Sequence, residues 1–165
     1  MSLRQLVIGP VMLERHGRTS TSGEIIKRVL QGRDPAMPRM PLNLVDVRDV
    51  ARCHLAAMEL ERGAVVGRRF ISHAENKMLP EVAALLRSKF ESQGFRPSLW
   101  TAPYLAVWLL SFCDPKLKAA LAAIRTEKVF ANGAARGTLL AGDAFVEARV
   151  SLVDMAESLI ALECV

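Results

Sequence analysis

Short apolar runs alternate with helical spacings of apolar residues along the chain. Leu6–Ile8 ends at Gly9-Pro10, which predicts a buried strand followed by a turn. Asn43–Val47 and Arg69–Ser72 predict two further short strands. A strand this close to the first residue is unusual, because a buried parallel strand normally has neighbours on both sides. These strands are too few and too scattered to make an independent sheet, so we expect them to need partner strands that this chain does not supply.

The rest of the pattern is mainly helical. Thr21 and Glu24 form a capping box that predicts a helix ending near Gly32. Asp46 or Asp49 is expected to cap a second helix, and neither is expected to be part of a catalytic pair. Further helices are predicted over residues 80–90, 103–113, 115–124 and 143–162. Residues 11–20, 33–41 and 133–142 are predicted to be loops.

The second of these helices, running to about Leu60, has one face predicted to point inward. The positions on that face are Val50, Ala51, His54, Leu55 and Met58. His54 is therefore expected to be a core histidine and not a metal ligand.

Length and composition indicate one globular domain over residues 1–165. Hydrophobic residues make up 51% and charged residues 24%, which excludes global disorder. The net charge is +5, but the basic residues are scattered and aromatic residues make up only 5%. A nucleic-acid binder would show a basic stripe with interleaved aromatic residues, so we expect no nucleic-acid partner.

The cysteines Cys53, Cys113 and Cys164 are widely spaced, which indicates neither a disulfide framework nor a zinc site. Cys53 and Cys113 lie in apolar stretches and are expected to be buried thiols of a reducing compartment. Because the N-terminus also lacks a signal-peptide pattern, we expect a cytoplasmic protein. The apolar stretch Leu99–Cys113 is shorter than the ~20 residues that span a bilayer, so a buried helix is expected over one at a membrane surface.

Several catalytic signatures are absent from the sequence. There is no Gly-x-Gly-x-x-Gly loop, no Walker loop and no Gly-x-Ser-x-Gly elbow. The three histidines, His16, His54 and His73, are too far apart in sequence to indicate a metal site. Tyr104 is the only tyrosine and the residue four later is Trp108, so the chain contains no Tyr-x-x-x-Lys pair.

Several segments, taken in order, resemble the C-terminal part of the extended short-chain dehydrogenase/reductase family, within the NAD-dependent epimerase/dehydratase superfamily. The segments are Leu6–Pro10, Thr19–Gly32, Asn43–Met58, Gly67–Ser72 and Asp143–Ile160. Val45–Asp49, Val-Asp-Val-Arg-Asp, is the most specific match. Nucleotide-sugar epimerases usually carry a second acid where Arg48 stands, so the sequence is most similar to the branch of dihydroflavonol reductases, cinnamoyl-CoA reductases and sterol dehydrogenases.

The resemblance implies an α/β fold: the helix-rich C-terminal part of an NAD(P)-binding Rossmann-type reductase, with few short strands and without the N-terminal nucleotide-binding half. It implies the substrate-binding portion of an NAD(P)-dependent oxidoreductase acting on a carbonyl or alcohol, inactive on its own. The alternative is a truncated, non-catalytic paralogue acting as a ligand-binding or protein-interaction module. NAD or NADP is the implied cofactor, not held tightly by this chain alone. The implied partners are a small-molecule substrate and either a nucleotide-binding half or a second copy of the chain.

The same resemblance assigns residues to a site. Backbone at Leu6 and Val7 is implied to contact the nicotinamide amide. The residues implied to line a substrate pocket are Pro10, Thr19, Ser20, Tyr104 and Trp108. No catalytic and no metal-ligating residue is expected within this chain.

Overall fold

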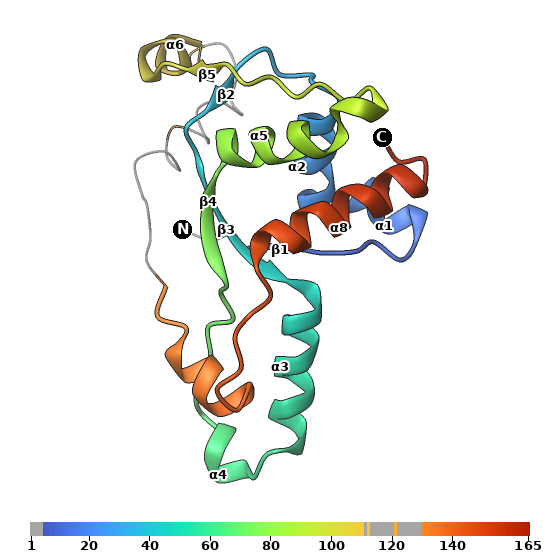
Figure 1. Ribbon diagram of the computed structural model, residues 1–165. Helices are drawn as coiled ribbons and strands as arrows, with labels where there is room; N and C mark the ends of the chain where they lie inside the picture. Colours follow the sequence, from blue (N-terminus) through green and yellow to red (C-terminus); the bar gives the residue numbers. More distant parts are fainter. Residues whose placement is uncertain (1–4, 111, 113–120, 122–129) are drawn as a thin grey trace.

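A small mixed sheet with helices on one face forms the centre of the molecule. The computed structural model describes residues 5–110, 112, 121 and 130–165 (Figure 1). Within these residues, three strands form a sheet in the order β1–β3–β4. The strands are β1 (Leu6–Ile8), β3 (Pro41–Asp46) and β4 (Glu75–Met78). The covering helices are α2 (Thr21–Leu30), α5 (Leu79–Phe90) and α8 (Ala148–Ala161).

Strand β3 pairs with both of its neighbours. It runs parallel to β1, with Leu44 beside Leu6 and Asp46 beside Ile8, and antiparallel to β4. The connection from β1 to β3 passes through α1 (Glu14–Thr19) and α2, which gives the crossover that parallel strands require. Among the described residues β1 pairs with β3 alone, so its other edge is open.

The remaining elements lie at the two ends of the molecule. At one end β2 (Met37–Pro38) pairs with β5 (Thr101–Ala102) next to α6, and α3 extends toward the other end (Figure 1). Their bounds are α3 (Val47–Glu59), α4 (Arg62–Val65), the 3-10 turn η1 (Glu91–Gln93), α6 (Tyr104–Leu110) and the π-helical turn η2 (Ala135–Leu139).

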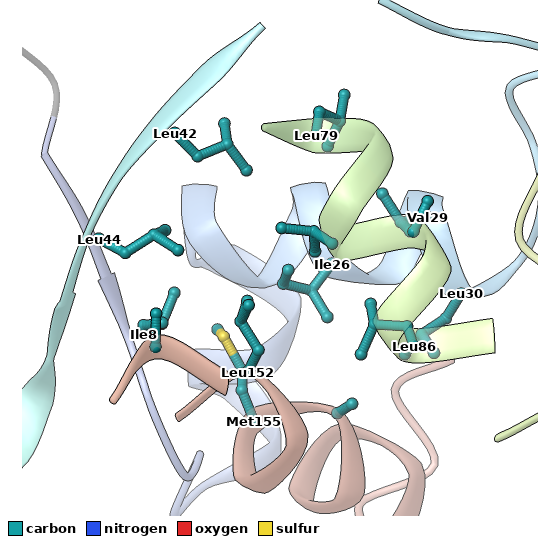
Figure 2. Close-up of a cluster of buried hydrophobic side chains, with 14 of the residues drawn as sticks. Ile8, Ile26, Val29, Leu30, Leu42, Leu44, Leu79, Leu86, Leu152 and Met155 are labelled. Atoms are coloured by element: carbon teal, nitrogen blue, oxygen red, sulfur yellow. The ribbon is translucent and has the colours of Figure 1, made fainter. Parts of the chain in front are cut away.

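The main core fills the space between the sheet and helices α2, α5 and α8 (Figure 2). Leu42 and Leu44 point into it from β3, because alternate residues of a strand face the same side. Leu30, Leu86 and Leu152 meet them from the helices, each with 0% exposure. Full burial of one such side chain stabilises the fold by roughly 1.5–3 kcal/mol, so this cluster holds the layers together.

Helix boundaries follow the local sequence closely. Ser20 caps α2, because its hydroxyl accepts the Gly23 amide at 3.1 Å, one residue before the predicted Thr21 cap. At α5, Pro80 occupies the first turn and Glu81 accepts the Met78 amide at 3.1 Å. Asp46 caps α3 through the Arg48 amide at 2.7 Å.

Several predictions from the sequence were wrong, and each concerns an element that tertiary contacts create. The strands do pair within the chain, and the one beside β3 is β4 and not Arg69–Ser72. Residues 33–41, predicted to be a loop, contain β2, which exists because β5 lies beside it. The other two predicted loops contain α1 and η2. The helix predicted over residues 115–124 lies outside the described residues.

Helix α3 buries the face opposite to the predicted one. Asp49 and Cys53 are its buried residues, whereas Leu55 is 56% and Met58 82% exposed. His54 is also exposed, with Nδ1 2.7 Å from the Val50 carbonyl oxygen, so it is not a core histidine. The reason is a second apolar cluster, which packs against the Cys53 side of the helix. Its buried members are Cys53, Ala135, Leu139 and Leu140.

Candidate functional site

Buried acidic side chains gather where β1 and β3 end. The parallel register brings Ile8 beside Asp46, after which one chain turns at Gly9-Pro10 and the other enters α3. In open α/β sheets, ligands bind outside the carboxyl ends of the parallel strands. This end of the sheet is therefore the place at which a site is expected.

Asp46 is held by donors from two directions. Its carboxylate accepts the Arg48 amide at 2.7 Å and the Arg48 guanidinium at 2.9 and 2.7 Å. The Ser151 hydroxyl of α8 donates to it at 2.5 Å. Burial raises the pKa of Asp46, but the hydrogen bonds from Arg48 and Ser151 outweigh it and hold the pKa below its usual value. Asp46 is thus a carboxylate, buried and fully hydrogen-bonded.

The neighbouring groups complete an ionic network. Arg48 also reaches Asp154 of α8 at 2.7 Å, and the hydrogen bond to Asp46 raises the pKa of its guanidinium. Asp49, which has 0% exposure, pairs with Arg52 at 2.5 Å and accepts the Val146 amide at 2.7 Å. Buried charges are tolerated only when they are paired and hydrogen-bonded, as these are. We call Asp46, Arg48, Asp49, Ser151 and Asp154 the clasp.

The clasp holds the Gly9-Pro10 turn in place. Both buried carboxylates accept hydrogen bonds from donors within the chain. A Cβ at Gly9 would lie 2.9 Å from Val47 Cγ1 and 3.3 Å from the Asp46 carboxylate. Gly9 also has φ +127°, a conformation that side chains disfavour. The clasp thus fixes the Gly9-Pro10 turn, and the Val11 amide anchors the same turn to Ser158 Oγ at 2.8 Å.

The two predicted cofactor contacts lie on the open strand. Leu6 packs its side chain partly into the core, and Val7 is 40% exposed. Their backbone runs along the edge of β1 that has no partner among the described residues. This edge leads to Gly9, where Val47 and Asp46 lie close to the backbone. A planar nicotinamide amide fits such a place, because strand backbone offers both donors and acceptors. Their assignment as cofactor contacts stays a prediction.

The predicted substrate-lining residues fall into separate groups. Pro10 follows β1 directly, and Thr19 and Ser20 lie at the junction of α1 and α2. Thr19 donates to the Arg15 carbonyl at 2.8 Å, and Ser20 caps α2, so both hydroxyls serve local structure. Figure 1 shows α6 at the upper left beside β5, whereas α1 lies at the right side of the molecule beside α8.

Tyr104 and Trp108 on α6 are 44% and 42% exposed. The structure therefore does not bring these two aromatic residues to Thr19 and Ser20. Their assignment to a substrate pocket stays a prediction.

Two residues of interest were not found from the sequence. Ser151 donates to Asp46 from within α8. A serine in an otherwise apolar helix face was the available signal. His73 is 6% exposed, its Nδ1 has no hydrogen-bond partner among the described residues, and its ring lies 4.9 Å from Phe130. Burial lowers the pKa of His73 and the nearby Glu75 charge offsets part of this effect.

Neither a metal cluster nor a membrane-spanning helix occurs among the described residues. In the described ranges, no three His, Cys, Asp or Glu side chains gather closely enough to hold a metal ion. Over the same part of the chain, no helix has both the length and the apolar character needed to cross a bilayer.

Comparison with known proteins gives the fold and a partial sequence match. No family model matches the chain. A putative dihydroflavonol 4-reductase of Synechocystis sp. is 41% identical over 70 residues, which are 42% of this chain and 20% of that protein. Gre2 from Candida albicans has a similar fold, with a TM-score of 0.68 at 19% identity over 96% of this chain and 43% of Gre2.

A second solved structure is the yeast methylglyoxal/isovaleraldehyde reductase Gre2 complexed with NADPH, with a TM-score of 0.65 at 19% identity. It matches 96% of this chain and 45% of the yeast protein. The chain thus spans less than half the length of these solved structures and a smaller share of the Synechocystis protein.

The fold is that of the C-terminal part of a Rossmann-type reductase, as the sequence predicted. The chain is similar to the C-terminal part of extended short-chain dehydrogenase/reductases. From its motif Val45–Asp49, the side chains of Asp46, Arg48 and Asp49 contribute to the clasp, and Val47 is the first residue of α3. The sequence match is to the dihydroflavonol reductase-like branch.

Proposed function

We propose that this chain is the substrate-binding portion of an NAD(P)-dependent oxidoreductase acting on a carbonyl or alcohol. The observation that carries the proposal is the combination of a 41% identical segment in a putative reductase with a fold that covers less than half of NADPH-bound reductase structures. Because the matched part is the C-terminal part, the nucleotide-binding portion has to come from residues outside this sequence.

Under this proposal, the residues of this chain help to position the cofactor and the substrate but do not supply the proton. A bound nicotinamide supplies or accepts the hydride. The backbone of Leu6 and Val7 would hold the nicotinamide amide, and the clasp would keep the Gly9-Pro10 turn fixed beside it. Tyr104 is followed by Trp108 and not by a lysine at the fourth position, so the proton donor is not in this chain. The isolated chain should therefore have no reductase activity.

The substrate contacts belong to the same proposal. Pro10, Thr19 and Ser20 lie near the carboxyl end of β1 and its crossover, whereas Tyr104 and Trp108 would reach the substrate from α6. A small-molecule substrate is the expected partner. A cytoplasmic location is supported by the Cys53 thiol, which is free and buried.

A fluorescence titration of the purified chain with NADPH tests whether cofactor binding requires the separate nucleotide-binding portion. The chain alone should give no saturable binding in the micromolar range. Fused to the N-terminal part of the Synechocystis protein, it should oxidise NADPH in the presence of small aldehydes or ketones. Trp108→Ala should raise KM with a smaller effect on kcat, because it removes substrate contact and not the reacting groups. Micromolar NADPH binding by the isolated chain, or no oxidation by any fusion, would contradict the proposal.

An interaction module is the second candidate function, favoured by the exposed side chains around α6. Trp100 is 78%, Leu105 65% and Phe112 73% exposed. When large apolar side chains are exposed close together, they usually form a binding surface for a protein or a ligand. If sizing shows a folded monomer that binds neither hydrophobic ligands nor a partner, this candidate is removed.

A further inference from the structure

Helix α6 carries large apolar side chains on the outside of the molecule. Leu105 is 65% and Leu109 55% exposed, and Phe112, in the turn that follows, is 73% exposed. These positions are four and three residues apart, the spacing at which side chains share one side of a helix. Val107, two residues from each leucine and thus on the opposite side, is 3% exposed. The sequence predicted a buried helix here, but the structure leaves this side of α6 in solvent.

Aromatic residues with a polar group gather at the same place. Trp108 is 42% and Tyr104 44% exposed on α6, and Trp100, just before β5, is 78% exposed. Trp108 packs edge-on against Phe112, with the ring centroids 5.1 Å apart. The whole sequence has two tryptophans and one tyrosine, so all of them lie within residues 100–108. We call Trp100, Leu105, Trp108, Leu109 and Phe112 the α6 surface.

The chain around the α6 surface is positively charged. Arg39 directly follows β2, which pairs with β5 immediately before α6, and Arg39 is exposed. Arg96 is also exposed and lies on the segment that leads into β5. The two segments that carry these arginines, residues 35–45 and 92–112, contain no Asp or Glu. The apolar side chains are therefore bordered by basic groups, which attract an anionic partner.

We propose that the α6 surface binds an anionic lipid bilayer, with α6 lying in the plane of the lipid headgroups. Tryptophan and tyrosine concentrate at the boundary between membrane and water, because each has an apolar ring and a polar group that stays hydrated. Leucine and phenylalanine on one side of a helix, with basic groups beside them, are typical of helices that lie in this boundary. Binding of this kind needs no membrane-spanning helix.

Charge and position favour a bilayer over a second copy of the chain. A symmetric dimer would place the α6 surface against itself and bring its basic border close to the same border of the other copy. Like charges that meet in this way oppose association. Figure 1 shows α6 at the upper left, beyond β2 and β5, where a flat surface can reach it.

Vesicle flotation of the purified chain tests the proposal. One set of vesicles contains phosphatidylcholine alone, and the other contains phosphatidylserine as well. The chain should float with the anionic vesicles, and higher ionic strength should weaken this binding. Both tryptophans of the sequence lie in the α6 surface, so tryptophan emission should shift to shorter wavelength when the anionic vesicles are added.

The first variant is Leu105→Glu with Leu109→Glu. It should lower partitioning into anionic vesicles by at least about tenfold, because it removes apolar burial and brings negative charge to an anionic surface. Leu55→Glu with Val66→Glu is the matched control, since these side chains are 56% and 70% exposed but lie toward the α3–α4 end of the molecule (Figure 1). The control adds the same charge and should bind within about twofold of the wild type, because distant charges are screened.

A second variant changes only the charge of the border. Arg39→Gln with Arg96→Gln should weaken binding to anionic vesicles by about fivefold per arginine. Binding to phosphatidylcholine vesicles should not change. Because both arginines are exposed, this variant should keep the thermal midpoint of the wild type. It therefore tests the proposal even if the glutamate substitutions disturb α6.

Three outcomes overturn the inference. The first is a wild-type chain that does not bind anionic vesicles. The second is an equal loss of binding in the control at the α3–α4 end, because net charge and not the α6 surface then governs binding. The third is a dimer of the isolated chain that the α6 glutamates dissociate, because the occupant is then a second copy. Vesicle binding and NADPH oxidation by the fusion are measured separately, so this inference and the proposed function can fail independently.

Discussion

The hydroxyl of Ser151 lies 2.5 Å from a carboxylate oxygen of Asp46, although the two residues are 105 positions apart in the chain. Both have 0% exposure. Asp46 ends the central strand β3 and caps α3, and Ser151 belongs to the first turn of α8. This bond therefore joins the last helix to the end of the sheet at which the candidate site lies.

Ser151→Ala should destabilise the fold by about 1–3 kcal/mol, because it leaves a buried carboxylate with one donor fewer. Urea unfolding followed by circular dichroism measures this change. Ser88→Ala is the matched control, since the Ser88 hydroxyl donates only to a carbonyl one turn back on the exposed side of α5. The control should stay within about 0.5 kcal/mol of the wild type. Equal stability of the two variants would show that the bond contributes nothing.

Gly9→Ala should cost about 1–3 kcal/mol, because the residue has φ +127° and its Cβ would crowd Val47 and Asp46. Gly63→Ala in α4 should be neutral or stabilising by up to about 1 kcal/mol, because nothing lies within 4 Å of a Cβ there. Thermal unfolding of both variants gives the comparison. A stable Gly9→Ala variant would mean that the turn can relax away from the clasp.

Asp49→Ala should release the segment that leads into α8. The Val146 amide loses the carboxylate acceptor that it meets at 2.7 Å. Its hydrogen exchange should become faster by about tenfold, as expected for loss of a charge-assisted hydrogen bond. Asp154→Ala is the control, because Asp154 pairs with Arg48 and not with this amide. Unchanged exchange at Val146 in the Asp49 variant would contradict the role given to Asp49.

His73→Gln should reduce the loss of stability at mildly acid pH. Burial lowers the pKa of His73 below the unfolded value of 6.5, so the unfolded chain binds the proton more tightly. This contribution to stability is present above pH 6.5 and falls as the pH drops below 6.5. Urea midpoints measured on either side of that pH should differ less in the variant than in the wild type. His16→Gln, at an exposed histidine of α1, should keep the wild-type dependence.

The sequence by itself determined the elements whose signals are local. The Gly9-Pro10 turn after β1, the proline in the first turn of α5 and the Asp46 cap of α3 are all local effects of residues on nearby backbone. The order of the motifs also indicated the resemblance to reductases, which the 41% identical segment of a putative dihydroflavonol 4-reductase supports.

Only the tertiary structure decided which surfaces are covered. The spacing of Leu55 and Met58 indicates an apolar face of α3, but it does not show whether this chain covers that face. The apolar cluster around Cys53 packs against the opposite side of the helix instead. Strands β2 and β4 and the bond from Ser151 to Asp46 depend on segments brought together from far along the chain. Local sequence patterns do not predict such pairing, because it depends on the packing energy of the whole fold.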